Sequence, residues 1–160
     1  MADEELILRL ENGHATIKSW PFTASITYQK NVFLKGMKGP KTVMTQTVPE
    51  GSGFKNTMTC FNLSPLEIDL GTVRHEIRNS KGVKIAEQKG KVYLTRGESV
   101  YTMTGTTTGV AAEGDATLVG VGVEEDNWNN QTIVSFNAPV TLTDEFVALC
   151  NGSGKIEKEN

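Results

Sequence analysis

Hydrophobic and polar residues alternate along most of the chain in short runs with a period of two, and the helical period of 3.6 is nearly absent. Successive side chains of a strand point to opposite faces, so this pattern predicts strands with one face toward a core. The runs are rich in threonine and valine and are separated by glycine, proline, asparagine or aspartate. This spacing is typical of all-β domains, and it predicts an antiparallel β-sandwich with one face of each sheet in water.

Turn-forming and helix-capping residues predict where hairpin turns and short helices lie. Glu11–His14 and Asn79–Val83 are predicted to be hairpin turns, the first because its Asn-Gly pair tolerates a positive φ angle. Short helices are expected at most near the termini. Ala2–Leu10 and Thr143–Gly152 are the two candidates, and Thr143 is the expected N-cap of the second. Each segment is also short enough to be a strand.

A chain of 160 residues is most simply one domain. A domain of this size buries about 70% of its unfolded surface, which is enough for a core without metals or disulfides. We therefore predict a single sandwich domain over residues 1–150 and a flexible, glycine-led and charged tail over residues 151–160. Cys60 and Cys150 lie in apolar runs and are expected to be buried thiols, although a disulfide between them stays open.

Charge narrows the range of partners. The net charge of −3 and the scattered lysines argue against a nucleic-acid or anionic-membrane surface, since either needs a concentrated basic face. The start of the chain is acidic, and its apolar stretch Leu6–Leu10 is too short for a signal peptide or a membrane span. We therefore expect a cytoplasmic protein with no membrane span; a fragment of a membrane-tethered or secreted protein is the alternative. A homo-oligomer stays open.

Three stretches carry a family resemblance: NVFLKGMKG at 31–39, FKNTMTCFNLSPLEIDLGTVRHEIRNSKGVKIAE at 54–87 and VYLTRGESVYTMTGT at 92–106. Together they resemble a fungal family of domains of unknown function, which is similar in layout to the late-embryogenesis-abundant type 2 (water-stress) β-sandwich. The resemblance covers roughly residues 17–108. It implies the sandwich fold, but the family has no settled activity, so it implies no catalytic residues.

His75 is the most unusual residue of the pattern, because it shares an apolar face with Val73 and Ile77. The resemblance implies an apolar or aromatic side chain in that row. One interpretation is a buried structural histidine whose ring nitrogens meet a backbone carbonyl or water. The other is a pocket histidine, kept neutral by burial, that exchanges protons or hydrogen bonds with a ligand.

Four aromatic residues are candidates for the wall of a cavity, although a small sandwich also uses such residues as plain core: Trp20, Tyr93, Tyr101 and Trp128. Trp128 lies in a polar stretch, where an exposed indole is costly without a partner, so it is the best candidate of the four for a ligand or interface contact.

The polar residues favour no metal or cofactor. Glu124–Asp126 and the asparagines that follow offer oxygen ligands but match no calcium-loop spacing, so a solvated hairpin loop is the simpler interpretation. The chain has only two histidines and two cysteines, and they lack the usual spacing of zinc ligands. We therefore expect no bound metal and no cofactor.

Two functional hypotheses follow, and the sequence leaves open whether the chain is an enzyme. The first is a module that binds a hydrophobic small molecule or a partner protein. The alternative is a cofactor-free cyclase or isomerase of fungal secondary metabolism, similar to a pericyclase, which needs little more than a shaped apolar pocket. There His75 would donate or accept a proton, Tyr101 or Tyr93 would assist, and Trp128 and Trp20 would contact the ligand. An apolar cavity of a few hundred Å³ beside His75 would support a ligand site, and a filled interior a scaffold.

Overall fold

The computed structural model describes residues 5–19, 21–36, 41–125, 127 and 129–152, and the described strands form two antiparallel sheets. The smaller sheet pairs β1 (Glu5–Ser19) with β2 (Phe22–Lys35). The larger sheet has seven strands in the order β3-β4-β7-β6-β5-β8-β9. They are β3 (Lys41–Glu50), β4 (Gly53–Asn62), β5 (Ile68–Asn79), β6 (Lys84–Leu94), β7 (Gly97–Thr107), β8 (Asp115–Val123) and β9 (Asn137–Thr141). The predicted all-β antiparallel fold is confirmed.

Two short helices, α1 (Asn130–Val134) and α2 (Asp144–Cys150), complete the described chain near its C-terminal end. The predicted helix after Thr143 is therefore present. The other candidate, Ala2–Leu10, belongs to strand β1 from Glu5 onward. Among the described helices, none has the length and apolar character needed to cross a membrane.

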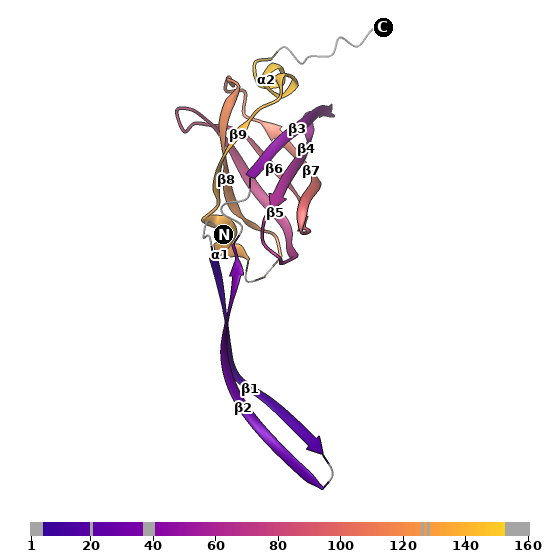
Figure 1. Ribbon diagram of the computed structural model, residues 1–160. Helices are drawn as coiled ribbons and strands as arrows, with labels where there is room; N and C mark the ends of the chain where they lie inside the picture. Colours follow the sequence, from indigo (N-terminus) through magenta and orange to yellow (C-terminus); the bar gives the residue numbers. More distant parts are fainter. Residues whose placement is uncertain (1–4, 20, 37–40, 126, 128, 153–160) are drawn as a thin grey trace.

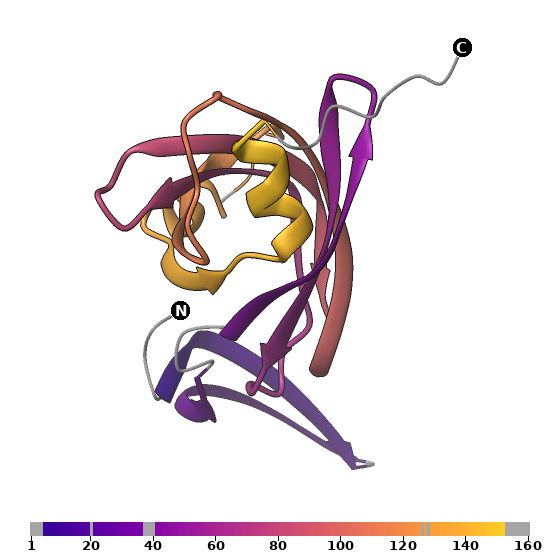
Figure 2. The same cartoon turned by 90° about the horizontal axis from the view of Figure 1, so that it is seen from above.

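The larger sheet curls strongly, so that its two edge strands β3 and β9 come near each other around one core (Figure 2). The inner surface of the curled sheet is mainly apolar because apolar residues alternate with polar ones along the strands, and successive side chains of a strand point to opposite faces. Cys60 and Cys150 are both buried and both free thiols, as expected. The largest fully buried apolar side chains are Phe54, Met58, Val73, Ile77, Ile85, Met103, Leu118 and Phe146.

Helix α2 covers one end of this core. The Thr143 hydroxyl accepts a hydrogen bond from the Phe146 backbone N–H at 3.2 Å, which caps the helix start as the sequence predicts. Phe146 is fully buried and meets the edge of the Phe54 ring, with centroids 5.0 Å apart and planes at 78°. This edge-to-face contact fixes the helix against the open end of the sheet.

One predicted turn is present and the other is wrong. At Asn79–Val83 the Asn79 N–H donates to the Val83 carbonyl at 2.9 Å, and the turn joins β5 to β6. Glu11–His14 lies inside β1, where the strand register shifts between Leu10 and Gly13 and Asn12 has a φ of 54°. The Asn-Gly pair thus supplies the positive φ of a bulge instead of a turn.

The strands β1 and β2 form a long hairpin that we call the arm (residues 5–35), and the part from residue 41 to residue 152 is called the body. The arm projects away from one end of the body, while α2 lies at the other end (Figure 1). Its strands pair with each other along their whole length and with no strand of the larger sheet. Most side chains on both faces of the arm are exposed, and Val32 and Leu34 near its base are half-buried.

Candidate functional site

His75 lies on β5 with its side chain inside the curled sheet, on the same face as Val73 and Ile77. Its exposed fraction is 5%, and its ring lies beside the ring of Phe136, with centroids 5.5 Å apart. Phe136 follows helix α1, so the segment after β8 closes over this side of the imidazole.

The structure brings two of the predicted site residues together. His75 and Tyr101 both line an interior cavity whose volume is only about 30 Å³. A cavity needs roughly 10–15 Å³ to hold one water molecule, so this space fits one or two waters. Ligand pockets are typically about 300–1,000 Å³. The rest of the wall is mostly apolar, formed by Thr42, Cys60, Leu70, Val73, Val92, Leu94, Ile133 and Phe136.

Burial keeps the groups around this cavity uncharged at neutral pH. It lowers the pKa of His75 to about 4, because the imidazolium would lose its hydration. It raises the pKa of Tyr101 above its ordinary value, a shift that a hydrogen bond with Thr42 partly offsets. Burial also raises the pKa of the Cys60 thiol, which is therefore a poor nucleophile.

A chain of polar side chains crosses the interior beside His75. The hydroxyls of Thr143 and Thr47 are 2.7 Å apart, and the Thr47 hydroxyl donates to Asn56 Oδ1 at 2.7 Å. The Asn56 amide then donates to Gln88 Oε1 at 2.9 Å. Gln88 is the cross-strand partner of His75, and both Gln88 Nε2 and His75 Nδ1 are buried without a hydrogen-bond partner among the described residues.

This polar chain joins α2, β3, β4 and β6, so it fixes which residues of these elements face one another. Analysis of the sequence for chemistry did not single out Thr47 or Gln88. Their signal is a polar residue at an inward position of the period-two pattern, the same signal that identified His75.

Replacing His75 with phenylalanine is expected to weaken the pH dependence of stability. Between about pH 6.5 and pH 4 the unfolded chain binds a proton at this residue and the folded chain does not, so wild-type stability falls as pH falls. From pH 7 to pH 5 this loss is about 2 kcal/mol. His75→Phe lacks it, and its larger ring can enter the small cavity.

The measurement is urea unfolding of both proteins at pH 7 and pH 5. The loss of stability on acidification is compared between the two proteins, so that the contributions of the titratable groups that both share cancel. Equal losses in the two proteins would show that His75 is not buried in its neutral form.

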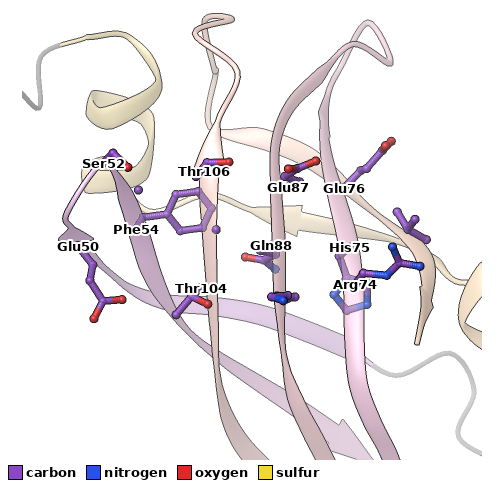
Figure 3. Close-up of a pocket in the computed structure, with 14 residues that line it drawn as sticks. Glu50, Ser52, Phe54, Arg74, His75, Glu76, Glu87, Gln88, Thr104 and Thr106 are labelled. Carbon is purple, nitrogen blue, oxygen red and sulfur yellow. The ribbon is translucent and has the colours of Figure 1, made fainter. Parts of the chain in front are cut away.

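A second hollow lies on the outer surface of the curled sheet. It has a volume of about 490 Å³ and spans β4, β7, β6 and β5 (Figure 3). Beside exposed polar and charged side chains, its lining includes the buried residues Phe54, His75 and Gln88. Its charged groups are largely neutralised by neighbours: the Lys84 ammonium is 2.7 Å from a Glu87 carboxylate oxygen and 3.6 Å from one of Glu76. Lys89 pairs with Glu124 at 2.9 Å. This open groove of paired charges has the character of a solvated surface.

The other predicted site residues do not join His75. Tyr93 is exposed on β6, and its hydroxyl donates to Glu67 at 2.9 Å, away from the cavity. Trp20 and Trp128 lie outside the described residues, so their predicted contacts with a ligand stay predictions. No group of three or more potential metal-ligating side chains comes together in the described part of the chain.

The arm presents a surface that the sequence analysis did not identify. In its register Leu8 lies opposite Val32, Ala15 opposite Ile26 and Ile17 opposite Ala24. Paired residues point to the same side, and the bulge shifts β1 by one residue, so a single face stays apolar on both sides of the bulge. The apolar face comprises Leu8, Leu10, Gly13, Ala15, Ile17, Phe22, Ala24, Ile26, Tyr28, Val32 and Leu34, with Lys30 as its one charged residue.

The opposite face of the arm is mainly polar and is formed by Arg9, His14, Thr16, Lys18, Thr23, Ser25, Thr27, Gln29 and Asn31. Near the base this face also carries one apolar pair, Ile7 and Phe33. At the middle of the apolar face the Tyr28 ring lies over Gly13, where a Cβ atom would come within 2.7 Å of the ring. The arm is thus an amphipathic ribbon whose apolar face lies in water: Phe22 exposes 76% of its surface and Ile26 exposes 46%.

The alternation from His14 onward predicted strands, whereas Ala2–Leu10 was a candidate helix or strand and Glu11–His14 a predicted turn. Only the register of the two strands reveals that their apolar faces coincide. Comparison of the chain with family models, curated proteins and solved structures finds no match, so the resemblance to the late-embryogenesis-abundant type 2 sandwich stays a prediction.

Proposed function

We propose that this chain is an assembly protein that acts by binding and not by catalysis, and that its copies associate through the apolar face of the arm. The observation that carries the proposal is that face, which runs along both strands of the arm and is broken by only one charge. Contiguous apolar surface of this kind marks an interaction site in a soluble protein.

Covering the apolar face of the arm with another protein surface is expected to be favourable in free energy. A two-stranded hairpin by itself is only marginally stable in water. Covering the remaining surface of a half-exposed large apolar side chain contributes about 1 kcal/mol, so the arm gains roughly 6 kcal/mol before the cost of association. Six large side chains of the apolar face expose 40% of their surface or more: Leu8, Leu10, Ile17, Phe22, Ile26 and Tyr28.

The interior of the body gives less support to the other hypotheses. A small-molecule site or a cyclase needs a cavity that encloses its ligand. The space that His75 shares with Tyr101 is about 30 Å³, and the hollow of about 490 Å³ that His75 also lines is open and bordered by charged side chains. Around the smaller space, the buried polar chain and the packed side chains have the character of a scaffold. The body is then best understood as the compact part that each arm carries into the assembly.

Sedimentation velocity of the wild-type chain over about a hundredfold range of concentration tests the proposal. We expect the weight-average mass to rise from that of the 17.4 kDa chain toward a multiple of it as concentration increases. Added salt should weaken the association little, because the contact surface is apolar. A single species of the mass of one chain at every concentration would rule the proposal out.

A further inference from the structure

We infer that the surface that receives the apolar face of one arm is the same face of the arm of a second copy, with the two arms antiparallel about a twofold axis near Tyr28. This inference rests on the proposed function and adds which surfaces meet and in which direction.

The surface that covers the apolar face must be about as long as the face itself. The face runs from Phe22 to Leu34 along β2, a length of about 40 Å at about 3.3 Å per residue. The described body offers no comparable strip. Its exposed large apolar side chains are scattered over several strands, turns and one helix: Val48, Phe61, Leu63, Val83, Tyr93, Val100, Val121 and Val134. Only another arm presents an apolar face of the same length and width.

The area of the contact agrees with a dimer of arms. A two-stranded ribbon about 40 Å long and about 11 Å wide offers about 450 Å² of flat face, so two arms bury about 900 Å², and more when side chains interdigitate. Specific interfaces begin at about 1,000–1,200 Å². The contact therefore needs overlap along the full arm, and edge-to-edge pairing of the arms would leave the apolar faces in water.

The position of Lys30 favours antiparallel arms over parallel arms. Lys30 is the one charged residue on the apolar face, and in a parallel arrangement the two Lys30 side chains would lie against each other. In the antiparallel arrangement Lys30 of one arm lies level with Ile26 of the other. The two ammonium groups are then about 13 Å apart along the strands, beyond the screening length of about 8 Å at physiological salt.

Tyr28 is the natural centre of this contact. It lies near the midpoint of β2, and its ring covers Gly13 of the paired strand. Tyrosine is enriched among the residues that dominate protein interfaces, because it buries a large rigid area and keeps a polar tip. A twofold axis there makes the contact self-complementary, as in most homodimers.

Cysteine cross-linking tests the arrangement. With the axis at Tyr28, Phe22 of one arm lies level with Leu34 of the other. Phe22→Cys and Leu34→Cys chains are purified separately, mixed, and oxidised with copper phenanthroline. The mixture should form at least about tenfold more covalent dimer than either variant alone. A second pair, Ala24→Cys with Val32→Cys, should behave in the same way, and sedimentation of each variant before oxidation reports whether it still assembles.

The matched control is Thr23→Cys mixed with Leu34→Cys, because Thr23 neighbours Phe22 but lies on the opposite face. This mixture should form no excess dimer, and the wild-type chain sets the background from the buried Cys60 and Cys150. Cross-linking of Phe22→Cys with itself would indicate parallel arms and overturn the inference. An assembled wild-type chain without cross-links in either mixture would overturn it too, while leaving assembly itself standing; a monomeric wild type would instead defeat the proposed function.

Discussion

Gly105→Val is expected to destabilise the body by at least about 3 kcal/mol, a large share of the stability of an ordinary domain. Gly105 lies on β7 directly opposite Phe54 of β4 and Gln88 of β6. A Cβ atom there would overlap the Glu87 carbonyl oxygen and come within 2.7 Å of the Phe54 ring. The ring would have to leave its contact with Phe146, and the backbone of β6 cannot move without breaking the sheet.

Urea unfolding of the variant measures this effect. Gly114→Ala is the matched control, because nothing lies within 4 Å of an added Cβ atom at Gly114. This substitution should leave the free energy of unfolding unchanged or raise it slightly. If Gly105→Val unfolds at the same urea concentration as the control, Phe54 does not pack over β7 as described.

Ile17→Glu is expected to weaken self-association about a thousandfold. Ile17 lies in the apolar face of the arm, opposite Ala24 and not level with Lys30 of either chain, so the substitution puts an unpaired carboxylate into the contact of both chains. Burying an unpaired charge and losing an apolar side chain costs about 2 kcal/mol per chain, or about 4 kcal/mol for a dimer. Sedimentation velocity gives the dissociation constants of the variant and the wild type.

Thr16→Glu is the matched control for this variant. It places the same charge on the same strand one residue away, but on the polar face of the arm. Its dissociation constant should stay within about threefold of the wild type, since exposed charges on a surface contribute little. Equal weakening by both variants would mean that added charge, and not the apolar face, controls association.

Much of the body could be predicted from local patterns. The alternation placed His75 on the inner face with Val73 and Ile77, and all three are buried. Thr143 was predicted to start a helix, and its hydroxyl caps α2. These predictions succeeded because strand faces and helix caps depend on residues only a few positions apart.

The arm could not be predicted in the same way. A strand of the arm and a strand of the body have the same alternation, so residues 5–35 gave no sign that they pair only with each other. The Asn12-Gly13 pair has a backbone preference that suits both a turn and a bulge, and the register of β1 with β2 decides between them. The pairing of Asn56 with Gln88 likewise depends on how the sheet closes, which joins residues far apart in the chain.

The size of the cavity beside His75 also had to come from the structure. The residue types around it are those of a pocket as much as those of a core, and only their packing leaves about 30 Å³ between them. The support for an interaction module comes instead from the apolar face of the arm, which forms only when β1 and β2 pair in their register.

Hydroxyl-radical footprinting of the wild-type chain at low and high concentration shows which face of the arm is covered, because it reads the exposure of single side chains. We expect Phe22, Ile26 and Tyr28 to become protected from oxidation as the chains associate, while Phe33 on the opposite face of the arm stays as reactive as before. Unchanged oxidation of Phe22, Ile26 and Tyr28 in a sample that has associated would contradict a contact through this face.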